Sequence, residues 1–480
     1  MLARIVRLSV ISLLLVSYSH AQPGLNDDSE IEEVTVIGSK MAVTFDELPA
    51  SASVLTDMQI DHARIERLSD IEGFIPNLKF SELGEVGAEF ISIRGIGVNP
   101  LSENRVAVYI DDMPFRTIND KLLLDVEQIE VLRGPQGTLY GTNTEGGVIV
   151  INTALPQGDV KLLGEMSSEH YRQGSRQQLL LNASGQISDN WAGRLALVRE
   201  QGDTYTQNID PVTDNSGDIE DTALLLTVLF YPASNMNLSL QYNGQFNRAD
   251  GIYEQTYIPV DSEAYNQVFA QPNPQLAQIW GISQVNSRPI GRQHQYHMDD
   301  IRSFDEDEQS LNLKVEYRWD KVKMVSITNF LDKVSSGWGA QFELTSFPLI
   351  NTGGKDSKQQ LFQEFRFSPT MADRLDWVLG LSGYTGKRSF VVGYKDLLAG
   401  QQQFTLLPPL KENSVDVAAF TNIKYDITNR LTGTLGLRWE RARREMRRQE
   451  DSAFFVGGQP MGVFPVVNES VTATEVLPKV

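Results

Sequence analysis

The sequence predicts an exported protein in which a compact α+β unit is followed by an antiparallel transmembrane β-barrel. Three observations support this. A short apolar stretch stands at the N-terminus, Gly-rich turns separate short apolar segments up to residue 153, and long alternating segments follow from about residue 159. Those late segments exceed the length of about five or six residues that is usual for globular strands, and about 9–11 residues suffice to cross a bilayer at a tilt.

Residues 1–21 predict a secretory signal peptide. Arg4 and Arg7 precede the apolar run Leu8–Val16, and small residues up to Ala21 suit a cleavage site. The alternative, a membrane-anchoring helix, needs a longer apolar run. Since no other apolar stretch of about 18 residues follows, we expect export without a membrane helix.

Composition excludes some functions. The chain carries 42 basic and 62 acidic residues, a net charge of -20, whereas nucleic-acid binding needs concentrated Lys and Arg. Cysteine is absent, so disulfides and thiolate metal sites are excluded. We expect no nucleic-acid partner.

Residues 22–44 are interpreted as a polar leader with one island of strand-forming character. The island consists of Glu32, Glu33, Val34, Thr35, Val36 and Ile37. Standing between polar flanks, it suits a single strand added to another protein, although it could also be the first strand of the next domain. Only ten residues, 22–31, precede it after the expected cleavage, too few for a folded domain.

Residues 45–153 predict the α+β unit. We expect a helix over Asp57–Leu68 and a second short helix over Leu68–Phe74, ended by Pro76. The expected strands are Phe90–Arg94, Val106–Ile110, Ile129–Arg133 and Gly147–Asn152.

Residues 154–480 predict the barrel, in about eleven strands. Met236–Asn247 is the clearest, with repeats at Ser310–Trp319 and Arg430–Glu440. The polar face of Met236–Asn247 is formed by Asn237, Ser239, Gln241, Asn243, Gln245 and Asn247. A soluble sheet also alternates, but six consecutive polar positions, mostly amides, favour a watery lumen.

The connections alternate between tight turns, such as Asp320-Lys321, and long polar stretches, such as 249–307, which is typical of membrane barrels. Aromatic residues near the expected strand ends predict interfacial girdles. They are Trp191, Tyr231, Tyr317, Trp319, Trp377, Tyr425 and Trp439. Thr474–Val480 looks like the start of a further strand, so we expect a piece of a longer barrel, because open sheet edges are costly in lipid.

Several long motifs resemble the plug of TonB-dependent outer-membrane receptors. They read ISIRGIG at 91–97, RVAVYIDDMPF at 105–115 and VEQIEVLRGPQGTLYGTNTEGGVIVINT at 126–153, and QLFQEFRFS at 360–368 continues the likeness into the barrel. The resemblance implies a plug inside a barrel of about 22 strands in the Gram-negative outer membrane. At Thr142 many relatives carry Arg or Lys, which leaves the role of a basic group there in doubt.

The resemblance also implies a mechanism. A scarce extracellular ligand, most often a ferric siderophore, binds outside and is imported into the periplasm. TonB, driven by ExbB and ExbD with the proton-motive force, pairs with the TonB box, which maps to Glu32–Ile37. The short leader implies a transporter without the signalling domain of transducing relatives. The alternatives are a plugged surface receptor or adhesin without transport, or an inactive truncated remnant.

In such relatives, arginines of the IRG and LRG motifs bond carboxylates of the barrel wall. Here these are Arg94 and Arg133; Glu130 lies close in sequence, and Glu364 is the candidate wall partner. Together these four residues are predicted as a plug–barrel lock, with unrelated lumen polarity as the alternative.

Other clusters carry less weight. Glycines 134, 137 and 141 are interpreted as turns and not as a phosphate cradle, because no GK[ST] follows and no helix is expected to open there. His294, His297, Asp299 and Asp300 could bind a metal, but chance proximity in one long loop is the stronger interpretation. With no catalytic arrangement in view, we expect no enzyme, no cofactor and no bound metal.

Overall fold

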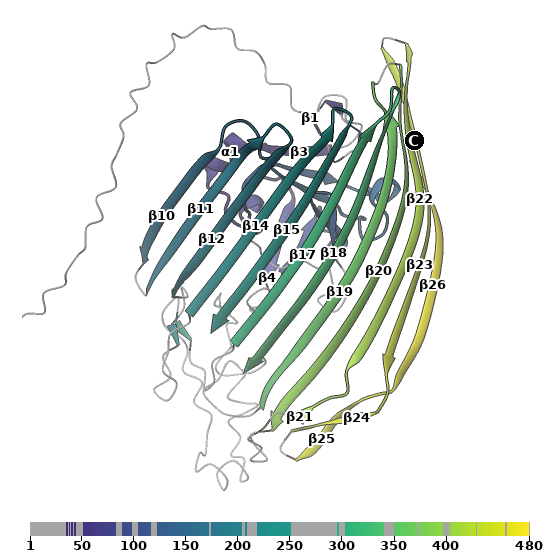
Figure 1. Ribbon diagram of the computed structural model, residues 1–480. Helices are drawn as coiled ribbons and strands as arrows, with labels where there is room; N and C mark the ends of the chain where they lie inside the picture. Colours follow the sequence, from purple (N-terminus) through teal and green to yellow (C-terminus); the bar gives the residue numbers. More distant parts are fainter. Residues whose placement is uncertain are drawn as a thin grey trace, which may run out of the picture.

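Two large sheets of different construction dominate the described part of the protein, seen in a computed structural model (Figure 1). A broad wall of tilted strands curves around a smaller α+β plug. The structure describes residues 35–36, 38, 40–41, 43–44, 51–82, 89–97, 104–116, 122–171, 174–203, 207–208, 218–250, 295–296, 303–339, 350–371, 374–396, 403, 405–428, 430–456 and 458–479.

The plug is built on a five-stranded sheet of order β3-β8-β9-β6-β7. Its strands are β3 Ser51–Thr56, β8 Val126–Arg133, β9 Gly147–Thr153, β6 Val106–Ile110 and β7 Met113–Phe115. β6 and β9 run parallel, and the other pairs are antiparallel. β6 and β9 are apolar along most of their length because both sheet faces are covered, and Val108, Ile129 and Ile149 are fully buried.

Short elements flank this sheet: α1 Asp57–Ala63, the 3-10 helix η2 Leu68–Gly73, the hairpin β4 Leu78–Glu82 with β5 Glu89–Ile93, and α2 Gly137–Tyr140. The helix expected up to Leu68 ends earlier, because Arg64 adopts a left-handed conformation and its N–H caps the last turn. The prediction that no helix opens at Gly137 was wrong. The side chains of α2 are buried, and such packing stabilises a turn too short to persist alone.

Within the described residues, the wall contains twelve long strands, each antiparallel to its neighbours, one more than the approximate count from the sequence. They are β10 Lys161–Tyr171, β11 Gly174–Ser188, β12 Trp191–Asp203, β14 Asp218–Ala233, β15 Met236–Asp250, β17 Ser303–Arg318, β18 Val322–Gly339, β19 Ile350–Pro369, β20 Leu375–Asp396, β22 Leu410–Thr428, β23 Leu431–Arg448 and β26 Val467–Lys479. β26 begins at Val467, before Thr474, where the sequence predicted the start of a further strand.

Small pairings complete the described chain. β21 Thr405–Leu406 extends the wall beside β20, and β24 Ser452–Val456 pairs with β25 Gln459–Phe464. Near the N-terminus, β1 Thr35–Val36 pairs with β2 Val43–Thr44, and β13 Gln207–Asn208 pairs with β16 Gln295–Tyr296.

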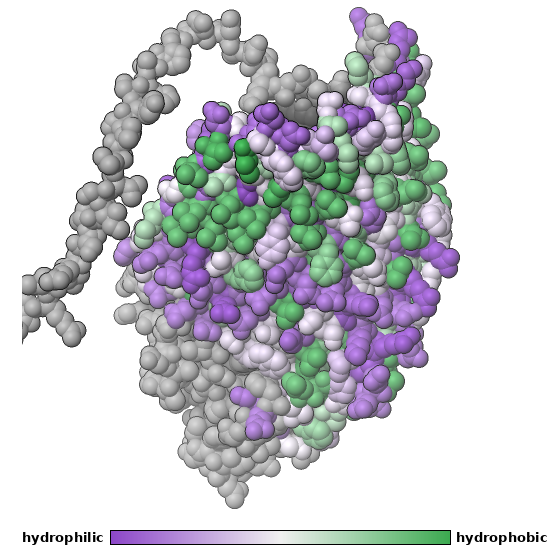
Figure 2. Space-filling model, in the orientation of Figure 1, coloured by the Kyte–Doolittle hydropathy of each residue, from purple (hydrophilic) through white to green (hydrophobic). Residues whose placement is uncertain are grey.

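The two faces of the wall alternate as the sequence indicated. On β15, Gln241 and Gln245 point inward and donate hydrogen bonds to the plug, whereas Leu240 points outward and is 45% exposed. The amide-rich face thus meets the plug at these positions. Figure 2 shows the outward apolar side chains as a band over the half of the wall nearest the short turns.

Aromatic side chains mark the short-turn end of this band. Trp191 stacks on Phe230 with ring centroids 4.2 Å apart, and Tyr317 meets Trp319 edge to face at 4.8 Å. Trp439 differs from the prediction, since it lies within β23 and not near its end. Within the described residues, no helix is long and apolar enough to cross a membrane.

Candidate functional site: the contact between plug and wall

The N-terminal hairpin brings part of the predicted TonB box into contact with its own chain. β1 and β2 are antiparallel, with Thr35 opposite Thr44 and Val36 opposite Val43. The other box residues, Glu32, Glu33, Val34 and Ile37, lie outside the described residues. The described part of the box is therefore already paired as a strand, with only a two-residue partner.

Directly after the box, Gly38 is held by the plug. Its N–H donates to the Glu130 carboxylate at 2.8 Å, and the Tyr140 hydroxyl donates to its carbonyl at 2.6 Å. A Cβ at this position would lie 2.8 Å from Glu130 Oε2, so only glycine fits without displacing the carboxylate. Glu130 itself is fully buried.

Two residues further on, Lys40 connects this segment to the barrel wall. Its ammonium lies 2.8 Å from a Glu364 carboxylate oxygen on β19, and 4.9 and 4.8 Å from the ring centroids of Tyr140 and Phe420. Burial lowers the pKa of Lys40 to about 8, against the opposing effect of Glu364. We call Gly38, Lys40, Glu130 and Glu364 the latch.

A second charged contact lies at the turn between β6 and β7. Asp111 and Asp112 both have positive φ, 49° and 68°, as a tight turn between paired strands requires. Asp112 accepts from Lys314 at 2.9 Å and from Arg366 at 2.8 Å, both on the wall. Although burial raises the pKa of Asp112, Arg366 and Lys314 hold it well below its usual range.

The neighbouring Asp111 is fixed by polar groups. Its carboxylate accepts from the Thr153 N–H and from Gln241, both at 2.8 Å, and the Asn312 amide donates to its carbonyl at 2.9 Å. We call Asp111 and Asp112, with their wall partners Gln241, Asn312, Lys314 and Arg366, the anchor. Arg366 also approaches Glu364 at 3.4 Å, so latch and anchor form one chain of alternating charges.

The predicted lock is only partly arranged as expected. Glu364 does bind the N-terminal segment from the wall, but its partner there is Lys40 and not Arg94 or Arg133. Arg133 donates to the carbonyl of Ala52 at 2.9 Å, within the plug, because β3 lies beside the end of β8. Arg94 occupies an exposed turn with a φ of 54°.

The anchor was not predicted from the sequence, although its acids lie within the plug motif at 105–115. Consecutive acids in a tight turn between two apolar strands were the available signal. Further ion pairs support the rim of the plug: Arg67 with Glu200 at 2.9 Å, and Asp125 with Arg194 at 2.7 Å.

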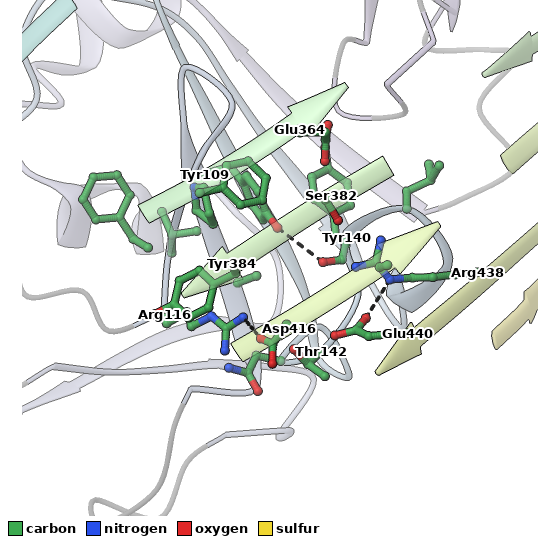
Figure 3. A pocket seen from close by; sticks show the side chains of 18 of the residues that line it. Tyr109, Arg116, Tyr140, Thr142, Glu364, Ser382, Tyr384, Asp416, Arg438 and Glu440 are labelled. Atoms are coloured by element: carbon green, nitrogen blue, oxygen red, sulfur yellow. Dashed lines mark hydrogen bonds and ion pairs between the residues drawn. The ribbon is translucent and has the colours of Figure 1, made fainter. Parts of the chain in front are cut away.

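A cavity of about 50 Å³ lies between the plug and strands β19, β20, β22 and β23 (Figure 3). Tyr109 and Thr142 line it from the plug, and Asp416, Arg438 and Glu440 from the wall. Arg438 donates to Glu440 at 2.7 Å. The volume suits a few water molecules and is far below the size of a metal chelate.

No group of three or more metal-ligating side chains stands together in the described residues. The loop residues His294, His297, Asp299 and Asp300 lie outside them.

Known proteins share this construction. Residues 44–148 match the family model of the TonB-dependent Receptor Plug Domain. The Pesticin receptor of Yersinia enterocolitica is 29% identical over 222 residues, 45% of this chain and 32% of its own length. The Vitamin B12 transporter BtuB of Vibrio vulnificus is 26% identical over 275 residues, 55% of this chain and 43% of its own.

Among solved structures, the ferric yersiniabactin uptake receptor FyuA from Yersinia pestis superposes with a TM-score of 0.68 at 19% identity, covering 89% of this chain and 61% of that one. The ferric citrate transporter FecA in the unliganded form gives a TM-score of 0.68 at 15% identity, covering 90% and 60%. The chain spans less than half the length of the curated relatives named here.

A plug held against an inward polar wall, with apolar side chains facing outward, defines a plugged β-barrel protein of the outer membrane. Residues 44–148 form a plug domain of the TonB-dependent receptor type, as the motifs indicated. These relatives are receptors and transporters, not enzymes.

Proposed function

We propose that this protein binds a scarce extracellular ligand and imports it into the periplasm, using force that TonB transmits from ExbB and ExbD. The observation that carries the proposal is the continuity of box and latch. One residue, Ile37, separates the box strand Thr35–Val36 from Gly38, which is hydrogen-bonded to the plug. Lys40 follows two residues later and pairs with Glu364 of the wall. A pull on the box therefore acts directly on the contact between plug and barrel.

The hairpin is suited to strand exchange. β1 is held along its edge by only two residues of β2, and each hydrogen bond contributes about 0.5–1.5 kcal/mol net. A strand of TonB can replace β2, because backbone hydrogen bonds supply most of the attachment in strand addition. Force then reaches Gly38 and Lys40 before any other described part of the plug.

The ligand class is proposed from relatives. A Ferrioxamine receptor of Yersinia enterocolitica is 26% identical over 227 residues, and both structures compared above are named for ferric chelates. We therefore propose a ferric siderophore as the ligand, with cobalamin as the alternative because Vitamin B12 transporters are also similar. The long polar connections between the wall strands would supply the ligand contacts.

The test is Val34→Pro in the box, with Val34→Ala as the matched control. Proline removes an N–H and blocks pairing, so we expect energised uptake to fall to background while ligand binding persists. Uptake and binding are measured in whole cells with radiolabelled ferrioxamine, ferric citrate and cobalamin. Normal uptake by Val34→Pro would refute the assignment of the box. Binding without energised uptake by the parent protein would favour a surface receptor.

A further inference from the structure

The charge of the outward-pointing side chains differs between the two sides of the wall. On β19, β20, β22 and β23, buried inward residues such as Glu364, Tyr384, Asp416 and Glu440 are all even-numbered, so odd-numbered residues point outward. Six exposed cations occupy these outward positions: Lys355, Lys387, Lys411, Arg441, Arg443 and Arg447. Among the described residues of these four strands, Glu445 is the one acid facing outward.

The other side of the wall lacks this excess. On β12, β14, β15 and β17, Arg199 and Arg248 point outward, but acids outnumber them. The acids include Glu220, Asp250, Asp305 and Asp307. In a chain of net charge -20, a local run of cations on one side is not a consequence of composition.

These cations begin where the apolar band ends. Along β23, the outward side chains Leu435, Leu437 and Trp439 are followed by Arg441 and Arg443. The neighbouring β22 runs the other way and agrees in register, with Val417 opposite Arg441, Val415 opposite Arg443 and Lys411 opposite Arg447. Figure 2 shows polar surface directly below the hydrophobic band.

Two of the arginines are held in place. Glu445 lies 2.5 Å from Arg443 and 3.5 Å from Arg447, so one carboxylate positions two guanidinium groups while both side chains stay more than half exposed. A guanidinium has several donors in a planar fork, and the donors not used by Glu445 remain for an external anion. We call Lys387, Lys411, Arg441, Arg443 and Arg447 the basic rim.

We propose that the basic rim binds the phosphate groups of lipids in the outer leaflet. The long connections mark the outer end of such a barrel, so the rim stands on the outer side of the apolar band. A lipid fits both surfaces at once, because its acyl chains lie along Leu437 and Trp439 while its phosphate reaches Arg441 and Arg443. A free phosphate ion would use only the second surface.

The test compares binding of the full chain to mixed micelles containing phosphatidic acid or phosphatidylcholine at equal mole fraction. We expect a preference for phosphatidic acid of at least about tenfold, because each cation near an anionic lipid surface strengthens binding severalfold. The triple variant R441Q/R443Q/R447Q should lose it. The matched control R199Q/R248Q, which removes outward arginines from the other side, should keep it.

Two further measurements control for misfolding of the variant and for binding of free phosphate instead of lipid. Glu445→Gln keeps every cation and removes the acid, so it should bind phosphatidic acid at least as tightly as the parent; weaker binding would contradict the proposal. An unchanged preference in the triple variant would overturn it. Complete displacement of phosphatidic acid by millimolar inorganic phosphate would also overturn it, by showing a site for the free ion.

Discussion

Latch and anchor both join the plug to the wall through buried charges, but they are built differently. The latch depends on a single cation, Lys40, on a hairpin of two-residue strands, and burial lowers the pKa of that cation to about 8. The anchor places one carboxylate, Asp112, between two wall cations, and its turn is part of the central plug sheet. Ion pairs of similar length can therefore stabilise either a contact that is easily broken, as in the latch, or one that is firmly held, as in the anchor.

Position along the chain reinforces this difference. The latch follows the box immediately, whereas the anchor lies about seventy residues further on, between the core residues Ile110 and Met113 of the plug. If TonB pulls on the box as proposed, the latch carries the load first. The shared neighbour Arg366, 3.4 Å from Glu364 and 2.8 Å from Asp112, keeps Glu364 paired after Lys40 leaves.

The largest effect is expected from breaking the anchor with Asp112→Asn. The amide leaves Lys314 and Arg366 without their carboxylate. Removing one partner of a buried ion pair costs about 3–5 kcal/mol, and because Asp112 and Lys314 are only partly buried we expect the lower end of this range. Limited proteolysis in increasing urea should show the plug unfolding at a lower concentration. Asp250→Asn, an exposed outward site, serves as the control and should leave the midpoint unchanged. A parent-like midpoint for Asp112→Asn would show that the anchor does not hold the plug.

Breaking the latch with Lys40→Met should have a smaller effect when measured at pH 10, where the docked Lys40 is neutral but still bonded to Glu364: loss of that hydrogen bond costs hairpin docking about 1–3 kcal/mol. Methionine keeps the packing against Tyr140 and Phe420, and Glu364 retains Arg366. Because the chain has no cysteine, Thr35→Cys gives a single spin-label site, and its mobility should rise in the variant. Lys79→Met, at an exposed ion pair of the plug, should not change it. An immobile label in Lys40→Met would contradict the latch.

The sequence predicted which face of the wall meets the plug, but not which residues pair across the contact. Alternation along strands identified which face of β15, β17 and β23 points inward, because the side-chain period is two. It could not identify partners, since Lys40 and Glu364 are 324 residues apart and their meeting depends on strand tilt and plug orientation. A lone lysine two residues after a glycine in a leader carries no sequence signal of burial. The long plug motifs, in contrast, predicted β5, β6, β8 and β9 to within a few residues.

The sharpest discrimination between the two contacts is expected from pH. The docked Lys40 has a pKa of about 8, below the ordinary value of 10.5. Between these values the undocked hairpin holds a proton that the docked one has lost, so docking strengthens as pH rises from about 8 to 10.5, by at most about 1.4 kcal/mol per pH unit. Below pH 8 both states are protonated, and docking carries the full cost of a buried charge. Mobility of the label at position 35 should therefore fall between pH 8 and 10, and this response should disappear in Lys40→Met. The anchor should not respond in this window, because the pKa of Asp112 is far below it. A label that loosens as pH rises would reverse the sign and show that the ion pair with Glu364 outweighs the cost of burying Lys40.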